Sequence, residues 1–281
     1  MNKIIIGILA LAGFTANAQN ALLWQISGNG LKEPSYIYGT IHLTCDATLD
    51  TPTKAALDNT QQLYLELDMD DPTMMTSMMM GMMMKDGQRM SALSSAEDFA
   101  LVDAYLMDKL GLSAKLVDNV KPAMVSTMLL PGLMPCALQS VEEELMRMVK
   151  QQNEEVLGLE TVNDQLAVFD AIPYQVQMDE LVESVKDKFA GDKAELDKMY
   201  KIYAEKDIIA MHNMMGTSNN DITAKYQDQL LYDRNAKWIP KIESIAKQKP
   251  TFFGVGAGHL AGPKGVLELL RKRGFKVEAV N

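Results

Sequence analysis

The chain has 281 residues, of which 37 are acidic and 27 are basic, and its formal net charge is −10. Such an acidic chain lacks the basic face that nucleic-acid phosphates require, so the composition excludes a nucleic-acid-binding protein. A chain of this length can bury one substantial core or two closely joined lobes.

Residues 1–18 predict a secretory signal peptide. Lys3 precedes an apolar run that ends near Ala12, and Ala16-Asn17-Ala18 is typical of a cleavage site. The apolar run is shorter than the roughly 20 residues that span a bilayer, so we expect no stable membrane insertion. We therefore expect export, to a bacterial periplasm or as a secreted protein. The sequence predicts no particular oligomeric state.

Residues 19–281 are expected to form a single domain. Alternating apolar residues predict strands, and apolar residues at helical spacing predict helices. The predicted strands cover residues 22–26, 36–41, 63–68 and 156–159, the start of 251–260, and 275–280. The predicted helices cover residues 52–59, 95–110, 141–153, 166–172, 175–189, 194–205, 222–247 and 263–274. Residues 112–122, 131–135 and 216–220 are predicted connectors.

Two histidine motifs organise these elements. Residues 35–43 (SYIYGTIHL) and 251–260 (TFFGVGAGHL) are both apolar runs that end in Gly-x-x-His-Leu. They supply two of the three histidines in the chain, His42 and His259. A glycine lets the backbone turn tightly or approach another group closely, and imidazole is a metal ligand or a general base near neutral pH. We therefore predict that the two histidines share one site.

Each histidine motif opens a strand–helix–strand unit. Such units predict an α/β fold with a mainly parallel central sheet, in which two similar strand–helix–strand halves are covered by helices with right-handed crossovers. The residues between the halves, about 69–155 and 165–247, are predicted to form a helical central insertion.

The ends of the predicted strands hold the candidate site, because ligands of open α/β sheets bind beyond the carboxyl ends of the strands. The side chains at or near these ends are His42, Glu66, Glu160 and His259. Two imidazoles and two carboxylates suit Mn²⁺, Co²⁺ or Zn²⁺ with one position open for water. The ion would activate the water, and a carboxylate that does not coordinate it would take the proton.

Simpler interpretations remain open for the individual residues. Glu66 suits a solvated strand position, and Glu160 suits a cap for the following helix. Arg234 suits either a bidentate contact to an anionic group or a salt bridge on a helix surface. His212, in the apparently helical run 210–215, is interpreted as a surface or packing histidine.

The two cysteines, Cys45 and Cys136, predict one disulfide, because an exported chain seldom keeps two free thiols. Two unpaired cysteines, or Cys45 as a metal ligand beside His42, are the alternatives. Residues 69–90 hold ten methionines. We interpret this tract first as an amphipathic helix packed on the core, second as an adaptable surface facing a ligand, and third as a Cu(I) site.

The combined motifs resemble the TraB/GumN family, which is related to the Tiki proteins. The similarity covers most of the chain after residue 18. It rests on residues 24–43, the Glu66 strand, residues 158–177 (GLETVNDQLAVFDAIPYQVQ), Asp233-Arg234-Asn235 and the closing GVGAGHLAGPKGVLELLRKRGFKV. The resemblance implies an α/β fold in which the paired motifs and glutamates form one site. For Tiki-like members it also implies metal-dependent peptidase activity supported by manganese or cobalt.

Applied to this chain, the resemblance implies catalytic roles for Glu66, Glu160 and Arg234. It also implies metal ligation by His42, Glu66, Glu160 and His259, with Gln165 as a further site residue. The leading hypothesis is an exported metal-dependent hydrolase of peptide or amide bonds that uses manganese or cobalt, with zinc as an alternative. The rivals are a non-catalytic protein that sequesters a peptide or small apolar ligand, and a haem or metal carrier.

Overall fold

The computed structural model describes residues 20–281, so the predicted signal peptide lies outside the described residues. Within this range the chain forms an α/β fold with one six-stranded mixed sheet and thirteen α-helices. The strands are β1 (Leu23–Gly28), β2 (Ser35–Thr40), β3 (Gln62–Leu67), β4 (Glu155–Glu160), β5 (Phe252–Gly256) and β6 (Phe275–Ala279). All six predicted strands are therefore present.

The strand order is β4-β3-β5-β2-β1-β6. Strands β2 and β5, β3 and β5, and β3 and β4 pair in parallel, whereas β1 is antiparallel to both neighbours. The two histidine motifs lie on the adjacent strands β2 and β5, where Gly39 pairs with Val255 and Thr40 with Gly256. The division into two similar halves with a central insertion, and the domain limits, stay predictions.

The helices begin and end where local side chains satisfy their free backbone groups. Asp50 accepts from the backbone N–H of Thr53 at the start of the first helix, and Ser95 and Ser140 act in the same way before two others. The helices are α1 (Thr51–Asp58), α2 (Met74–Gly81), α3 (Met90–Leu93), α4 (Ala96–Leu110), α5 (Pro122–Leu129), α6 (Val141–Gln151), α7 (Val162–Asp170), α8 (Tyr174–Lys186), α9 (Ala190–Ala204), α10 (Ile208–Gly216), α11 (Asp221–Lys225), α12 (Asp233–Gln248) and α13 (Val266–Lys272).

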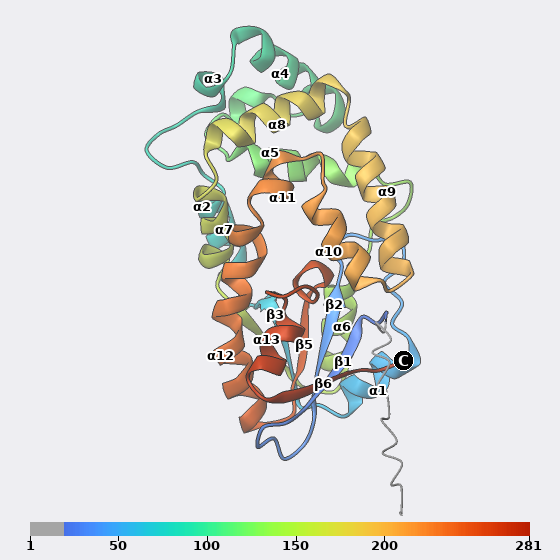
Figure 1. The fold of residues 1–281 in the computed structure, drawn as a ribbon. Coiled ribbons are helices and arrows are strands. Elements are labelled where there is room, and N and C mark those ends of the chain that lie inside the picture. The colour runs from blue at the N-terminus through green and yellow to red at the C-terminus, as the bar shows by residue number, and fades with distance from the viewer. Residues whose placement is uncertain (1–19) are drawn as a thin grey trace, which may run out of the picture.

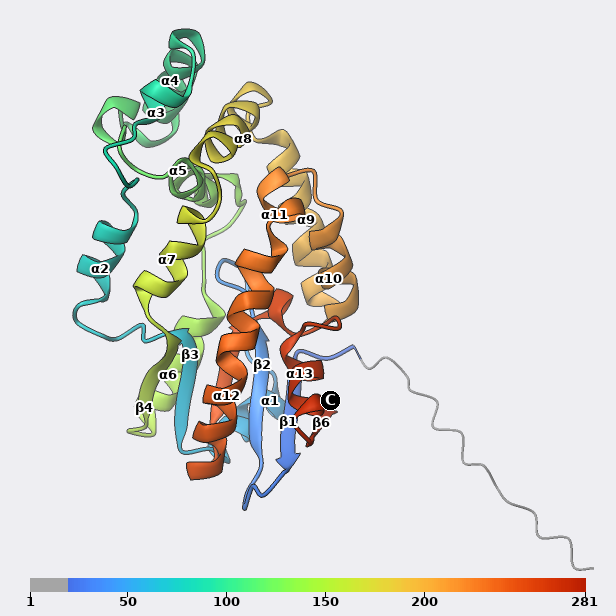
Figure 2. The ribbon, with the colours of Figure 1, turned by 60° about the vertical axis from the view of Figure 1, so that its left-hand side comes forward.

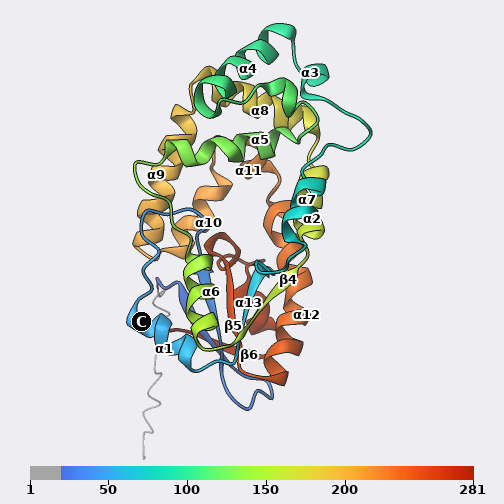
Figure 3. The same cartoon turned by 180° about the vertical axis from the view of Figure 1, so that it is seen from behind.

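Helices cover both faces of the sheet. Figure 1 shows α12 and α13 on one face, and Figure 3, from behind, shows α1 and α6 on the other. Their apolar residues join those of the strands in one core, which includes the fully buried Leu57, Leu145, Trp238, Phe252 and Leu270.

The remaining helices form a lobe beyond the ends of the strands, where α2 to α5 and α7 to α11 lie (Figures 1 and 2). This lobe has a second core that includes Met90, Leu106 and Leu181. The buried Lys121 holds it further, because its Nζ lies 2.7 Å from Asp170 Oδ1 and donates to the carbonyl of Leu166. The carboxyl ends of the parallel strands therefore face a separately packed helical lobe.

Two predicted helices differ from the structure. The predicted helix 222–247 is interrupted, because α11 ends at Lys225 and a π-helical turn, Asp228–Tyr232, precedes α12. In the methionine tract, α2 spans only Met74–Gly81 and has no buried residue. The helix ends there because the following segment pairs with residues near 120, through the Met83–Val120 bridge. One face of this tract, with Met74, Met78 and Met82, packs against the second core, while Met75, Met79 and Met80 are exposed. The prediction of an amphipathic helix packed on the core is therefore confirmed over α2, and only its length differs.

The predicted disulfide is confirmed between Cys45 and Cys136, whose Cα atoms are 5.7 Å apart. This bond excludes the alternatives of free thiols and of Cys45 as a metal ligand. No helix within residues 20–281 is long and apolar enough to cross a membrane.

Candidate functional site

Arg234, in the first turn of α12, joins the two predicted glutamates. Its Nη2 donates to Glu66 Oε2 on β3 and to Glu160 Oε1 at the end of β4, the latter over 2.6 Å. Its Nε also donates to Glu160 Oε1, over 3.0 Å, so the guanidinium grips that carboxylate with two nitrogens. The side chains are only 11%, 8% and 6% exposed for Arg234, Glu66 and Glu160. The cluster is therefore a buried ion network at the carboxyl ends of two neighbouring strands.

The remaining donors of Arg234 are also engaged. Nη1 donates to the carbonyl of Leu230 over 3.0 Å and lies 3.1 Å from His259 Nε2. A guanidinium has five N–H donors, so none is left for another partner in this conformation. The indole of Trp238 adds a second support, because its Nε1 donates to Glu160 Oε2 over 3.1 Å and its ring lies 4.8 Å from the guanidinium carbon.

Asn235 determines the tautomer of His259. The amide Nδ2 of Asn235 donates to the carbonyls of Lys264 and His259, over 2.9 and 3.3 Å, which fixes the orientation of the amide. Its Oδ1 must then accept from His259 Nδ1, at 2.6 Å. The proton of the neutral imidazole therefore sits on Nδ1, and Nε2 presents a lone pair to Arg234.

Burial and charge set the ionisation of the cluster. Burial of the imidazole lowers the pKa of His259 to about 3, although the carboxylate of Glu66 opposes this. Burial also opposes ionisation of Glu66, but His259, Arg234 and the backbone N–H of Gly256 outweigh it and lower the pKa of Glu66 to about 2. Near neutral pH, Glu66 is therefore ionised and His259 is neutral.

The glycines of the two motifs permit close approach. The backbone N–H of Gly256 donates to Glu66 Oε1 over 2.8 Å, and a Cβ on this residue would lie 3.2 Å from the same oxygen. A Cβ on Gly39 would lie 2.8 Å from Leu260 Cδ1 and 3.1 Å from Ala257 Cα. Neither glycine has a positive φ, so close packing, and not a tight turn, requires them.

His42 does not contact this cluster. Its side chain is 67% exposed, and its Nδ1 lies 2.7 Å from Oε1 of the buried Glu142 on α6. Ser140 donates to the other oxygen of that carboxylate over 2.8 Å. The hydrogen bond to the carboxylate of Glu142 raises the pKa of His42 to about 9. His42 is therefore adjacent to the network along the sheet but paired elsewhere.

The structure brings together most of the predicted site residues, while their catalytic and metal-binding roles stay predictions. Glu66, Glu160, Arg234 and His259 are in direct contact, and Gln165 Nε2 donates to Glu66 Oε2 over 3.1 Å. Glu66 is buried and is not a solvated strand residue. Glu160 is not the cap of α7, because Thr161 and Asp164 form that capping box. The residues that sequence reasoning missed are Asn235, Trp238 and Glu142.

Two of these three residues carry a signal in the sequence. Asn235 directly follows Arg234 in the triplet that the family resemblance singled out, and Trp238 lies one helical turn beyond Arg234. Glu142 carries no comparable signal, because it is one of three consecutive glutamates at the start of α6. His212, interpreted as a packing residue, lies on α10 with its ring centre 6.3 Å from that of Tyr232.

The described residues do not form a ready-made metal site. Across residues 20–281, no three His, Cys, Asp or Glu side chains stand together in a way that could hold an ion. The reason is that Glu66, Glu160 and His259 each accept at least one hydrogen bond from Arg234, so the guanidinium occupies the place between them. As arranged, these side chains fit a guanidinium and not a metal.

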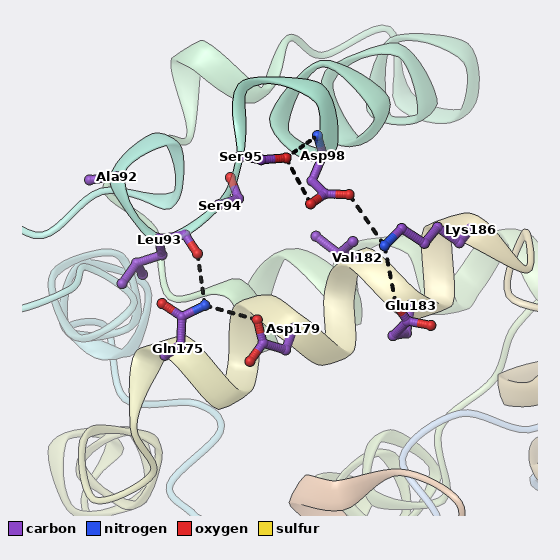
Figure 4. A pocket seen from close by; sticks show the side chains of 10 residues that line it. All are labelled: Ala92, Leu93, Ser94, Ser95, Asp98, Gln175, Asp179, Val182, Glu183 and Lys186. Carbon is purple, nitrogen blue, oxygen red and sulfur yellow. Dashed lines mark hydrogen bonds and ion pairs between the residues drawn. The ribbon is translucent and has the colours of Figure 1, made fainter.

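Two surface cavities lie outside the cluster. One, of about 450 Å³, lies between α8 and the segment from α3 to α4. Figure 4 shows that its polar side chains pair with one another, as Lys186 does with Asp98 and Glu183. The other, of about 780 Å³, lies beside β1, β6 and α13. Neither is lined by a residue of the Arg234 network.

The chain is similar in sequence to several proteins that are named metalloproteases. "Metalloprotease TIKI1" and "Metalloprotease TIKI2" from Danio rerio are each 21% identical to the chain, over 313 and 318 residues. "Metalloprotease TIKI1" from Xenopus tropicalis is 24% identical over 315 residues. Each alignment covers 92% of this chain but only 61% to 63% of the relative, so the chain spans less than two thirds of their length. No solved structure matches the chain significantly.

The strongest comparison is with a family model, which matches residues 22–279 and so includes every strand and helix described above. Both histidine motifs, both glutamates and Arg234 lie inside the matched range. The chain therefore belongs to the TraB/PrgY/gumN family.

Proposed function

We propose that this chain is an exported hydrolase of peptide or amide bonds that works with a divalent metal ion. Two kinds of observation support the proposal. Relatives named metalloproteases align with 92% of the chain. In addition, two glutamate side chains and a neutral imidazole converge at the carboxyl ends of the parallel strands, the usual place for a site in such a sheet. That convergence on one buried position is the observation that carries the proposal.

The side chains of the cluster have the properties that hydrolysis requires. His259 is neutral with Nε2 unprotonated, so it can accept a proton or donate its lone pair to a Lewis acid. Glu66 is ionised and buried beside it, with Oε1 3.6 Å from His259 Nε2. Asn235 and the N–H of Gly256 hold these two groups in place without taking their reactive positions.

The proposed ion is manganese or cobalt, with zinc as the alternative. A divalent ion would polarise a carbonyl or lower the pKa of a bound water. We propose His42, Glu66, Glu160 and His259 as its ligands, although the arrangement described above does not yet present them together.

Export is proposed on the signal-like residues 1–18. An oxidising compartment agrees with the disulfide between Cys45 and Cys136. We propose a peptide or small apolar ligand as the partner.

A binding protein without catalysis is the second candidate. It is favoured by the exposed methionines of α2, since Met75, Met79 and Met80 are 71%, 60% and 73% exposed. Flexible thioether side chains adapt to varied apolar ligands. A haem or metal carrier is a weaker candidate, with no separate observation in its favour.

A peptide-library cleavage assay tests the proposed function. The purified chain is stripped of metal by chelation and then reloaded with Mn²⁺ or Co²⁺. We expect cleavage only after reloading, and its loss in Glu66→Gln, which keeps the shape of the side chain but removes its charge. Cleavage by the stripped protein would reject metal dependence. Retention of peptides without cleavage in either state would favour the binding protein.

A further inference from the structure

The charge balance of the buried cluster is incomplete. Glu66 and Glu160 are opposed by the single positive charge of Arg234, while the ring of His259 carries one proton, because Nδ1 donates to Asn235 and Nε2 faces a donor of Arg234. All three charged side chains are at most 11% exposed, so water does little to stabilise the excess negative charge. A doubly charged cation would balance the two carboxylates where one guanidinium does not.

The three acceptor atoms already have the supports that metal ligands usually have. His259 Nδ1 is held by Asn235, and Glu160 Oε2 accepts from Trp238. Glu66 Oε1 accepts from the N–H of Gly256. Supporting contacts of this kind orient ligands at metal centres. His259 Nε2, Glu160 Oε1 and Glu66 Oε2 in turn accept from the guanidinium of Arg234, and Glu66 Oε2 also accepts from Gln165 Nε2.

Resting on the proposed function, we infer that Arg234 and a divalent cation are mutually exclusive occupants of the Glu66–Glu160–His259 cluster. An ion would need the lone pairs that now accept from the guanidinium, at about 2.0 to 2.2 Å. Two cations sharing the same lone pairs would also repel each other. Arg234 is therefore a latch, and the ion is held only when this side chain withdraws.

The backbone next to Arg234 offers a route for that withdrawal. The residue follows directly on the π-helical turn Asp228–Tyr232, and its Nη1 is bonded to the carbonyl of Leu230 inside that turn. Single π-helical turns are rare and occur often at functional sites. The ring of Trp238 lies beside the guanidinium and can keep a cation–π contact with Arg234 when the guanidinium leaves the two carboxylates.

Metal titration tests the latch. Isothermal titration measures the binding of Mn²⁺ and Co²⁺ to the chelated wild-type chain, to Arg234→Gln and to Arg234→Lys. We expect Arg234→Gln to bind one ion at least about tenfold more tightly than the wild type. Arg234→Lys should have an intermediate affinity, because lysine keeps the positive charge but lacks the planar guanidinium that binds a carboxylate with two nitrogens. Arg147→Gln is the matched control, since it removes an exposed arginine that pairs with Glu144. It should bind like the wild type.

Two results would overturn the latch. Equal or weaker binding by Arg234→Gln, with native circular dichroism, would overturn the latch. If that variant is folded but too unstable for titration, thermal melting replaces titration: the latch requires Mn²⁺ to raise the melting temperature of Arg234→Gln by more than that of the wild type. No such difference would also overturn it. Because these readouts do not depend on cleavage, a chain without peptidase activity can still confirm the latch, and an active peptidase can still refute it.

Discussion

Asn235 illustrates how one uncharged residue sets the state of a buried histidine. It is fully buried and accepts from Nδ1 of His259 while donating to two backbone carbonyls. The amide oxygen of Asn235 carries no net charge, so it does not offset the cost of burying a charged imidazolium, and the pKa of His259 stays low. A carboxylate in the same position would favour the charged form instead.

We therefore predict that Asn235→Asp raises the pKa of His259 by about 1 to 3 units, because an opposite charge would lie in contact with the imidazole. An NMR titration of the histidine ring protons measures this pKa directly. Asn235→Ser, which supplies a neutral acceptor, is the control. An unchanged pKa in Asn235→Asp would show that Asn235 does not set the charge of His259.

The low pKa of His259, about 3, predicts that acid destabilises the fold. In the unfolded chain this residue takes up a proton near pH 6.5, whereas in the folded chain it stays neutral, so the free energy of unfolding falls as the pH falls from about 6.5. Glu66 adds a loss only below about pH 4.5, because its folded pKa is about 2. His42, whose folded pKa is about 9, contributes stability that is already complete below pH 6.5 and is lost as the pH rises through 9.

Urea unfolding between pH 6 and pH 5 isolates the contribution of His259. We expect the wild type to lose up to about 1 kcal/mol more than His259→Gln over this interval, because glutamine cannot take up the proton. If the free energy of unfolding changes equally with pH in the two proteins, His259 is not a neutral, buried imidazole in the folded chain.

At the scale of the elements, the paired histidine motifs depend on close backbone contact between β2, β5 and β3. Gly256→Ala would place a Cβ 3.2 Å from Glu66 Oε1 and disturb the hydrogen bond from its N–H. We predict a loss of about 1 to 3 kcal/mol in the free energy of unfolding, since the buried carboxylate has little room to move. Gly132→Ala, with nothing within 4 Å of the new Cβ, should change stability little. Chemical unfolding of both variants measures the difference, and equal stabilities would contradict the need for close approach.

The methionine tract divides into exposed and buried members. Met75, Met79 and Met80 are exposed, whereas Met90 is fully buried in the second core. We predict that Met75→Ser, Met79→Ser and Met80→Ser each change the free energy of unfolding by less than about 0.5 kcal/mol. Met90→Ser should cost about 2 to 5 kcal/mol. Unfolding curves test this, and strong destabilisation by Met75→Ser, Met79→Ser or Met80→Ser would contradict the exposed position of these side chains.

The tract also bears on ligand binding. Helix α2 packs against α7, which carries Gln165, a contact of Glu66. A role in binding an apolar ligand, or Cu(I), stays a prediction for the exposed methionines.

At the scale of the whole molecule, the disulfide stabilises the segment that follows His42. Cys45 and Cys136 are 91 residues apart, and beside them Thr44 exchanges two backbone hydrogen bonds of 2.9 Å with Gln139. These contacts tie the segment after β2 to the start of α6, where Glu142 pairs with His42.

Loss of the disulfide should therefore lower stability and loosen this pair. In the chain-entropy model, closure of so long a loop contributes roughly 4 kcal/mol, so Cys45→Ser with Cys136→Ser should lose about that amount. Urea unfolding of oxidised, reduced and doubly substituted protein measures the loss. Mass spectrometry after alkylation without reduction provides the control, and two reactive thiols in native protein would contradict the bond.

Sequence patterns by themselves determined the strands, most of the helices and the positions of Glu66, Glu160 and His259 at strand ends. Alternation of side chains decides which face of a strand a residue occupies, and parallel strands present their ends at one edge. This alternation is a local property of the sequence, so it can be recognised without knowing which other segments pack against the strand. It also marked Arg234, through its resemblance to a family motif.

Only the tertiary structure decided which groups meet across that edge. His42 is paired with Glu142 because α6 packs against the sheet, a contact between residues 100 positions apart. Arg234 lies among the predicted ligands because α12 follows the π-helical turn and covers the same face of the sheet. Asn235 meets His259 for the same reason. Local periodicity places a side chain on a face, but its partner depends on how distant helices pack, and that packing set the charge, the tautomer and the latch of this site.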